Sequence, residues 1–426
     1  MKKRILFLRR TCGFGGVEKC ILDLLAGVDY ERSDVWLASL TDVFSRRIAT
    51  RRLPVTLIPL PVPVTGGLRR FFFAWVAFLR RVRPDQIIMV EGGFFDFPWL
   101  AVLAAYLVSG GRVYMTEHLA AFAPPPKVSR IHFGFLPGLG LWWYKQVWPR
   151  RIRGYLAKRI LAVSKGVREK LITYYGYPRE KIHVAYRWAD TSRFAPASEE
   201  KRRSLRATLG IPDDAVVVVS TARLDPIKCL DRLIRAFGVL SPAHPNLWML
   251  IAGEGPLRDE LEGLAKSVDP NQRIRFLGHL EDVSPVIQAS DIYVLPSDEE
   301  GFATALVEAM SAKLTCVATR ATGPTEIIED GENGFLVERS YEGVLNGLEK
   351  ALLLREDQKR AMGECARATV EEHFQMWNGV QRMLTLLDIE FVQAPPLEVS
   401  ASSDLQLSTG EQGRRPYSWR PSSIRS

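Results

Sequence analysis

The sequence has 426 residues, 47% of them hydrophobic and 25% charged, an ordinary globular composition with room for two or three cores. No apolar run reaches the roughly 18 residues of a membrane span, and the basic start has too few apolar residues for a signal peptide. The five cysteines lack Cys-x-x-Cys or zinc spacing, which favours free thiols in a reducing compartment.

Charge is divided unevenly along the chain. Residues 1–190 hold 31 basic against 13 acidic side chains, a balance of +18. Residues 191–426 hold 26 against 35, a balance of −9. The basic half suits an anionic membrane surface, nucleic acid or a phosphorylated substrate.

The first half alternates β-like runs with helical patterns, which predicts a parallel sheet with crossover helices. A first strand at Arg4–Arg9 is followed by Gly13-Phe-Gly-Gly-Val-Glu18 and an amphipathic stretch. Glycine at this point permits close approach to a phosphate, and a tight turn without a ligand explains it equally well. Further strands are predicted at 35–40, 55–59, 86–90, 112–116 and 159–164, with helices at 71–83, at 98–108 and after Ser164.

Two segments of the first half suggest ligand or surface contacts. Thr116-Glu-His118 ends a strand, where α/β folds place ligand groups, although a lone histidine is more often structural. Phe133–Arg151 combines Trp142, Trp143 and Trp148 with glycines and a basic end. This pattern is typical of a membrane-interface segment, and a buried irregular loop would look the same.

A change in composition marks a domain boundary. Ser198-Glu-Glu-Lys-Arg-Arg is charged and Ile211-Pro-Asp-Asp is a turn, after which a second α/β series begins. We predict a first domain at 1–192, a second at 193–374 and a disordered Pro/Ser-rich tail at 393–426. Strands of the second domain are predicted at 216–221, 247–252, 273–277 and 291–295, and helices at 341–354 and 356–372.

The stretch from Leu295 to Glu308 carries the strongest functional signal. A short strand and a polar turn precede a helix that we expect to open at Gly301-Phe302, a layout that aims backbone N–H groups at an anion or sugar. Glu300 and Glu308 are eight positions apart, which at about 3.6 residues per turn returns them to one azimuth. Both carboxylates could then line a cleft. Alternatively, they favour the helix dipole and a solvated helix face.

A pair of cations follows another strand of the second domain. Thr221-Ala-Arg223-Leu-Asp-Pro-Ile-Lys228 places Arg223 and Lys228 just beyond the strand end. Fixed donors at such a point suit a diphosphate leaving group, whereas an isolated pair would be a surface feature.

Taken together, Glu300-Gly-Phe-x5-Glu-Ala-Met, Gly323-Pro-x-Glu326 and Asp330-Gly-Glu-Asn-Gly-Phe-Leu-Val337 resemble the donor-sugar site of the retaining GT-B glycosyltransferases of family 4. The resemblance covers roughly residues 4–390. It implies an α/β GT-B fold of two Rossmann-like domains facing across a cleft. In that fold the last helix, here within 375–392, crosses back to complete the first domain.

The resemblance also implies which residues act. The catalytic residues would be His118, Arg223, Lys228 and Glu300. The donor-binding residues would be Gly15, Gly16, Arg223, Lys228, His279, Leu280, Glu300, Gly301, Phe302, Ala303 and Glu308.

Each of these residues would have a distinct role. The loop amides at Gly15-Gly16 and the two cations would neutralise the leaving diphosphate. Glu308 would hold the ribose, and backbone groups at 279–280 would read the base. Glu300 and the amides at 301–303 would hold the sugar, with His118 contacting a sugar hydroxyl.

Some positions depart from the family pattern. Arg187 and Trp188 stand where Tyr-Asn-Pro-x-Asp is usual, which questions the inter-domain role of that loop. Ala222 and Cys229 replace two glycines of the Gly-Arg-Leu-x-x-x-Lys-Gly motif, and the Cys229 thiol could be reactive. Ala303 replaces a frequent glycine, which leaves the sugar open.

The resemblance thus predicts sugar transfer from a nucleotide-diphosphate donor, with UDP favoured over GDP. The acceptor would be lipid-linked or a glycan in surface-polysaccharide synthesis, at the inner face of the cytoplasmic membrane. No Asp-x-Asp pair is present, so no metal or other cofactor is expected, and no nucleic-acid partner is expected. The alternatives are a nucleotide-sugar epimerase and a non-enzymatic protein that binds nucleic acid or another anionic ligand.

Overall fold

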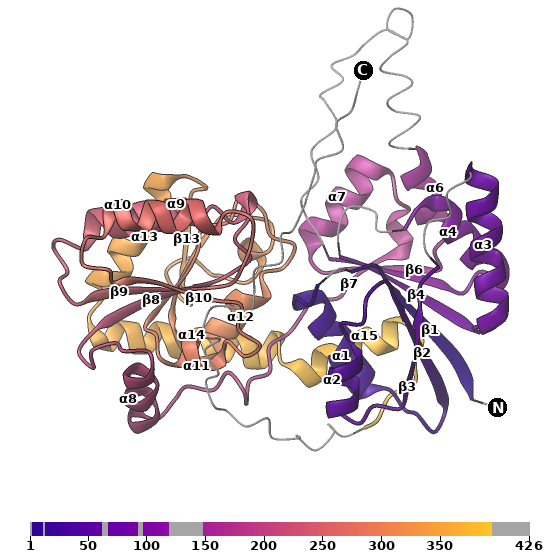
Figure 1. Ribbon diagram of the computed structural model, residues 1–426, viewed down its shortest axis with the longest axis horizontal. Coiled ribbons are helices and arrows are strands. Elements are labelled where there is room, and N and C mark those ends of the chain that lie inside the picture. Colours follow the sequence, from indigo (N-terminus) through magenta and orange to yellow (C-terminus); the bar gives the residue numbers. More distant parts are fainter. Residues whose placement is uncertain (1, 12, 62–66, 93–96, 119–147, 394–426) are drawn as a thin grey trace, which may run out of the picture.

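The computed structural model describes residues 2–11, 13–61, 67–92, 97–118 and 148–393. These residues form two α/β domains that lie side by side, each built on a parallel sheet covered by helices on both faces (Figure 1). In the described part of the chain no helix has the length and apolar character needed to cross a membrane.

The first sheet has seven strands in the order β3-β2-β1-β4-β5-β6-β7. Its strands are β1 (Lys3–Arg9), β2 (Ser33–Ser39), β3 (Val55–Pro59), β4 (Gln86–Glu91), β5 (Val113–Glu117), β6 (Arg159–Ala162) and β7 (Ile182–Val184). The helices of this domain are α1 (Gly16–Gly27), α2 (Ser45–Thr50), α3 (Gly67–Val82), α4 (Trp99–Ser109), α6 (Trp148–Leu156) and α7 (Lys165–Tyr175).

Strand β1 shows why this sheet needs helices on both faces. Its side chains alternate between two cores, because successive residues of a strand point to opposite faces. Ile5 and Phe7 are buried in the core that includes α1. Leu6 and Leu8 are buried in the core that includes α3 and α4. A strand that is apolar on both faces is typical of a buried parallel sheet.

The second sheet has six strands in the order β10-β9-β8-β11-β12-β13. Its strands are β8 (Val216–Thr221), β9 (Leu247–Ala252), β10 (Ile274–Gly278), β11 (Ile292–Leu295), β12 (Thr315–Thr319) and β13 (Phe335–Val337). The helices are α8 (Glu199–Thr208), α9 (Leu230–Leu240), α10 (Arg258–Val268), α11 (Ser284–Gln288), α12 (Thr304–Ser311), α13 (Tyr341–Leu353) and α14 (Glu356–His373).

Both sheets share one topology, with the first strand of each domain beside its fourth. The strand order therefore reverses direction between β1 and β4 and again between β8 and β11. In open parallel sheets, ligands bind outside the carboxyl ends of the strands at such a switch point. The prediction of two Rossmann-like domains is confirmed.

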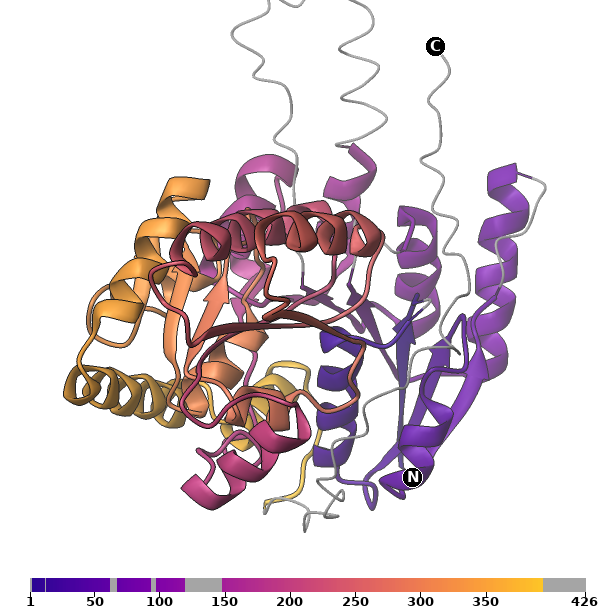
Figure 2. The ribbon, with the colours of Figure 1, turned by 60° about the vertical axis from the view of Figure 1, so that its left-hand side comes forward.

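Helix α15 (Met376–Leu386) leaves the second domain and packs beside α1 on the first sheet (Figures 1 and 2). Val380 and Leu384 belong to the core of that domain. A Cβ atom at Gly27 of α1 would lie 2.6 Å from Val380, so glycine is needed for this close approach. The chain passes between the domains near Ala189 and again near Phe374. These two segments are hydrogen-bonded to each other, because the Ala189 amide donates to the Phe374 carbonyl at 3.0 Å.

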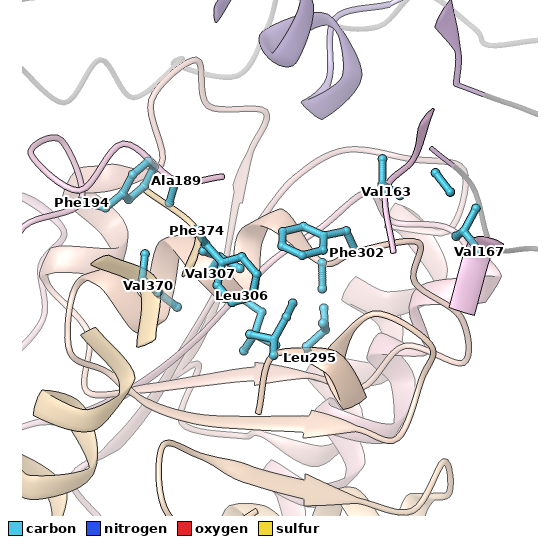
Figure 3. Close-up of a cluster of buried hydrophobic side chains, with 14 of the residues drawn as sticks. Val163, Val167, Ala189, Phe194, Leu295, Phe302, Leu306, Val307, Val370 and Phe374 are labelled. Carbon is cyan, nitrogen blue, oxygen red and sulfur yellow. The ribbon is translucent and has the colours of Figure 1, made fainter. Parts of the chain in front are cut away.

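The domains also share an apolar contact. Figure 3 shows Phe302 of the second domain with Val163 and Val167 of the first domain on one side and Phe374 on the other. The rings of Phe302 and Phe374 have centroids 5.3 Å apart, and the Tyr186 ring lies 5.7 Å from Phe302. These aromatic rings therefore form part of an apolar contact that joins the two domains.

Three expectations need correction or stay open. Helix α12 begins at Thr304 rather than at Gly301-Phe302, because Ala303 has a left-handed backbone with φ 71°. The charged stretch after Ser198, predicted only as a boundary, forms helix α8, with the Ser198 hydroxyl accepting from the Lys201 amide. Of the predicted interface segment 133–151, residues 133–147 lie outside the described residues, and so does the tail from residue 394.

Candidate active site

The predicted site residues lie in the segments that follow the carboxyl ends of β1, β5, β8, β10 and β11, with Gly16 in α1 and Glu308 in α12. Three of these strands flank the two switch points, so the glycine-rich loop after β1 faces the loops after β8 and β11. Contacts between the domains show which of these residues meet.

Lys228 and Glu300 meet at the centre of the second-domain part of the site. The Lys228 Nζ lies 2.6 Å from Glu300 Oε1, and the Ser297 hydroxyl donates to the same oxygen at 2.8 Å. The side chains are 21% and 11% exposed, so this ion pair is largely shielded from water. A shielded cation beside a helix start suits an anionic ligand.

Arg223 occupies a different environment from Lys228. Its Nε donates to Asp225 Oδ2 at 2.7 Å, while 77% of its side chain is exposed. The exposed Arg223 side chain can therefore reorient toward a ligand, whereas Lys228 is already held in place.

Glu308 forms an ion pair that the sequence did not indicate. Its Oε1 lies 2.6 Å from Nζ of Lys19 in α1, so the pair joins the two domains. Lys19 also lies 5.0 Å from the centroid of the Phe194 ring. The only sequence signal for Lys19 is its place one turn after Gly15-Gly16, which puts it on the first turn of α1.

The charges of Glu300 and Glu308 both act on the buried hydroxyl of Tyr293. Burial raises the pKa of Tyr293 above its usual range, and the charges of Glu300 and Glu308 raise it further. That both carboxylates line one site stays a prediction, and a shared helical azimuth cannot be its reason, because Glu300 precedes α12 in the chain.

The glycine-rich loop is internally bonded. The Gly15 amide donates to Glu18 Oε2 at 3.0 Å, and Arg9 Nε donates to the other oxygen of Glu18 at 2.8 Å. The Gly16 carbonyl accepts from the Arg187 guanidinium. The predicted diphosphate-facing amide of Gly15 is thus held by Glu18 in this structure.

Arg187 and Trp188, which depart from the family pattern, anchor their loop to the first domain. The Trp188 indole donates to Asp23 Oδ2 in α1 at 3.1 Å, while Arg187 covers Gly16. The neighbouring Ala189 pairs with the returning chain at Gln375. The loop is therefore anchored to the first domain and pairs with the chain segment that returns from the second domain.

His118 meets the second domain at Gly301. Its ring nitrogen Nε2 lies 3.0 Å from Thr116 Oγ1, and the residue is 8% exposed. Burial, followed by the charges of Arg187 and Arg9, holds the pKa of His118 well below its usual value, so the ring is neutral. Its backbone carbonyl lies so close to Gly301 that a Cβ atom there would clash.

The remaining predicted residues fall into two groups. Phe302 and Ala303 are buried beside Gly301, and a Cβ atom at Gly323 would lie 2.6 Å from the Phe302 backbone. His279 is exposed and Leu280 is buried just after β10, at the edge of the second sheet. The next residue, Glu281, pairs with Arg47 of the first domain at 3.1 Å. Positions 279–280 therefore lie at the rim of the inter-domain contact.

Glu326 joins the domains in a way that its motif did not reveal. Its carboxylate accepts from the amides of Lys165 and Gly166 at 2.9 and 2.7 Å and from the Tyr186 hydroxyl at 3.0 Å. The amides begin α7, so the carboxylate neutralises the positive end of that helix. Burial, and then the charge of Glu326, raises the pKa of Tyr186 to about 12.

Cys229 has no sign of a reactive thiolate. Burial, and then a hydrogen bond with Asp298, raises the pKa of its thiol to about 11, so the thiol stays protonated at neutral pH. Its backbone keeps a left-handed φ of 48°, which glycine would adopt without strain.

Comparison with known proteins supports one family. Residues 14–193 match a family model described as Glycosyltransferase Family 4, and residues 201–369 match one described as Glycosyl transferases group 1. The putative glycosyltransferase EpsD of Bacillus subtilis is 33% identical over 40% of this chain and 44% of that protein. The D-inositol 3-phosphate glycosyltransferase of Corynebacterium kroppenstedtii is 30% identical over 49% of each. The chain thus spans about half the length of these curated relatives.

Solved structures agree in fold. The HepE protein of Anabaena, in complex with UDP and glucose, superposes with a TM-score of 0.72 at 21% identity, covering 91% of this chain and 99% of that one. WaaG, described as a glycosyltransferase involved in lipopolysaccharide biosynthesis, gives 0.68 at 17% identity, covering 90% and 99%. EpsD, the Corynebacterium protein and WaaG carry glycosyltransferase names, and none of the comparisons supports the epimerase alternative. With both domains matched, the chain belongs to the family 4 glycosyltransferases of the GT-B fold.

Proposed function

We propose that this protein transfers a sugar from a nucleotide-diphosphate donor to an acceptor, with retention at the anomeric carbon. The observation that carries the proposal is the presence of two ion pairs beside the strands of the switch points, Lys228 with Glu300 and, across the domains, Lys19 with Glu308. A nucleotide-sugar needs cations for its diphosphate and carboxylates for its hydroxyl groups. Here Lys228 follows β8, and Glu300 and Glu308 follow β11.

The donor would enter by exchanging partners with the existing ion pairs. The diphosphate would take the Lys228 ammonium from Glu300 and recruit the exposed Arg223, so that both cations face the charge that develops on the leaving group. Glu300 would then be released toward the sugar hydroxyls. Glu308 would accept from the ribose hydroxyls in place of Lys19.

His118 would act as a neutral hydrogen-bonding group for the sugar. Its carbonyl already touches the Gly301 turn, so its ring is fixed beside the predicted sugar position. The lowered pKa supports a role in positioning rather than in proton donation.

We propose a UDP-sugar as donor, ahead of a GDP-sugar. Support comes from the surface-polysaccharide character of the Gly323-Pro-x-Glu326 and Glu117-His118 motifs and from HepE, whose structures hold UDP. The competing case is a Corynebacterium glutamicum relative, 31% identical, which is named as a GDP-mannose-dependent mannosyltransferase.

The acceptor would be lipid-linked or a growing glycan at the cytoplasmic face of the membrane. The basic first domain supports this placement, since its balance of +18 exceeds what the donor requires. No metal is assigned, because the sequence has no Asp-x-Asp pair and the two cations supply the charge at the diphosphate.

A donor-binding screen tests the proposal. Melting temperature is measured with UDP, GDP and ADP at equal concentration, since a ligand that binds only the folded state stabilises it by about 2.7 kcal/mol at 100 times Kd. UDP should give the largest shift. Lys228→Met should remove that shift, while Lys266→Met, which changes an exposed lysine of α10, should keep it.

Radiolabelled donor distinguishes the remaining alternatives. Release or transfer of the labelled sugar supports a transferase, whereas an epimerised donor without release would identify an epimerase. If no nucleotide shifts the melting temperature and no donor is consumed, the proposed function is wrong. A larger shift with GDP would reverse only the donor assignment.

A further inference from the structure

Arg187 is a cation without a carboxylate partner at the carboxyl edge of the first sheet. Its guanidinium donates to the Gly16 carbonyl, and no acidic side chain of the described residues forms an ion pair with it. Three other cations of the same region do have acidic partners: Arg9 with Glu18, Lys19 with Glu308, and Arg153 with Glu91. A partly buried guanidinium keeps its charge, so the absence of a carboxylate favours an anion supplied by a ligand.

The loop after β7 carries Arg187 to the boundary between the two domains. The preceding side chain, Tyr186, contacts the second domain, with its ring 5.7 Å from that of Phe302. The following side chain, Trp188, donates to Asp23 of the first domain. Arg187 lies between these two anchors, so its charge stands where the domains meet.

Anchoring of this loop does not explain why the residue is an arginine. The Gly16 carbonyl lies in the first turn of α1, where a regular helix supplies an acceptor with the amide four residues later. The bond from Arg187 is therefore an additional one. The loop is also held by the Trp188 indole and by the Ala189 amide, which donates to the Phe374 carbonyl. Asparagine is usual at this position in the family pattern, so the positive charge distinguishes this chain from that pattern.

A buried ring nitrogen near Arg187 also lacks a partner. His118 is 8% exposed, and its Nδ1 forms no hydrogen bond with a described residue. Burial first, and then the charges of Arg187 and Arg9, lower the pKa of this ring, so both guanidinium groups act on it. Buried polar atoms of native proteins are almost always hydrogen-bonded, and an orphaned one therefore indicates a group that binds there.

The two features lie beside the glycine-rich loop. Two guanidinium nitrogens of Arg187 are 3.4 Å from the position that a Cβ atom of Gly16 would take. This loop leaves β1 at the switch point of the first sheet and faces the loops after β8 and β11. The guanidinium and the imidazole are therefore placed to meet a ligand held between the domains.

We propose that Arg187 is a further substrate-binding residue of the reaction site and that its ligand is a phosphoryl group. A guanidinium donates parallel hydrogen bonds to two phosphate oxygens, which makes arginine well suited to such a group. Lys228 and Arg223 belong to the second domain, so Arg187 adds a cation from the first. The inference rests on the proposed function, because the phosphoryl group is that of a reactant, either the diphosphate of the donor or a phosphate of the acceptor.

Melting shifts with uridine and with UDP test the diphosphate of the donor. The two ligands share base and ribose, so the ratio of their apparent dissociation constants reports the diphosphate. Arg187→Gln should weaken UDP binding about 10- to 100-fold, the range for a hydrogen bond to a charged group, and leave uridine binding unchanged. Arg187→Lys keeps the charge without the planar fork and should recover part of the loss.

Inorganic phosphate tests a phosphate of the acceptor. It is added to the protein alone and to the UDP-saturated protein, in which the donor's phosphate positions are filled. A further melting shift that the wild type shows and Arg187→Gln lacks, with equal UDP affinities, would assign Arg187 to the acceptor. A loss of UDP affinity would assign it to the donor.

Arg80→Gln is the matched control. Arg80 is an exposed arginine of α3, a helix on the side of the first domain that is remote from the second domain (Figure 1). This variant should bind uridine, UDP and phosphate like the wild type. Arg187→Gln loses one hydrogen bond to Gly16 and should still fold, because the anchors at Trp188 and Ala189 remain, and its melting temperature without ligand checks this.

Equal affinities of the wild type and Arg187→Gln for UDP and for phosphate would overturn the inference, whatever happens to the melting temperature without ligand. A UDP shift that depends on Lys228 and not on Arg187, with no phosphate effect, would leave the proposed function intact and remove only this role. If no nucleotide stabilises the wild type, the proposed function is wrong. Phosphate alone then decides the inference, which is refuted unless phosphate stabilises the wild type and not Arg187→Gln.

Discussion

Replacing Lys228 by methionine should separate its contribution to stability from its contribution to catalysis. Methionine keeps much of the side-chain volume but removes the charge that lies 2.6 Å from Glu300. Glu300 would keep only the hydrogen bond from the Ser297 hydroxyl. Because the carboxylate is only 11% exposed, leaving it without its cation should cost about 1–3 kcal/mol of unfolding free energy.

Catalysis should lose more than stability. Removing one preorganised donor to a developing negative charge typically costs about 2.7–4 kcal/mol, so turnover at saturating donor should fall about 100- to 1,000-fold. The double variant Lys228→Met/Glu300→Gln no longer has an unpaired carboxylate. It should regain most of the lost stability and none of the lost turnover.

Urea unfolding and donor turnover, measured on the wild type, both single variants and the double variant, give the coupling free energy for each property. Arg223→Ala is the companion variant. Because Arg223 is 77% exposed, its replacement should lower turnover with little effect on stability. Turnover near the wild-type value in Lys228→Met would refute the role of this lysine at the diphosphate. Recovery of turnover in the double variant would show instead that the lysine acts only by neutralising the negative charge of Glu300.

Three further outcomes are expected. Glu308→Gln should weaken UDP binding measured by calorimetry, because an amide accepts ribose hydrogen bonds less strongly, whereas unchanged affinity would leave Glu308 as a partner of Lys19 alone. Ala303→Gly should raise the unfolding free energy by about 0.5–1 kcal/mol, since an alanine at positive φ is strained. Ala303→Val should lower it. Equal unfolding free energies for the wild type and both variants would contradict the left-handed backbone. The pKa of His118 is lowered in the folded state, so the full free energy of unfolding is retained above pH 6.5. Below pH 6.5 this free energy should fall by up to about 1.4 kcal/mol per pH unit. Urea titrations should detect that loss in the wild type and not in His118→Gln.

The sheets and most helices could be predicted because each has a local signal. Short apolar runs between glycine and proline turns predicted most strands of both domains but not β7, β12 or β13, and helical periodicity predicted α13 and α14. The start of α12 could not be predicted in this way. Alanine favours helices, and only the packing of Gly301 against the His118 carbonyl and of Gly323 against Phe302 explains why the chain turns left-handed at Ala303.

The cross-domain partners of the site had no local signal. Lys19 and Glu308 are 289 residues apart, and the contact between them depends on how the two domains are oriented. Glu326 belongs to a recognisable motif, yet its partners are backbone amides at the start of α7, which no sequence pattern identifies. Residues whose role is to join domains are therefore the ones that sequence reasoning missed.

Helix α15 has a consequence for how the chain is completed during synthesis. The first sheet emerges from the ribosome early, but the core on its α1 face is incomplete until Val380, Met383 and Leu384 have been made. The second domain, which lies between, has all of its strands by then and can finish first, since domains generally fold as units during synthesis. A shortened chain that stops at residue 192 would leave part of that core exposed to water. The amino-terminal domain is therefore the last to mature, and dissecting this protein requires joining 375–392 to 1–192 rather than cutting between the domains.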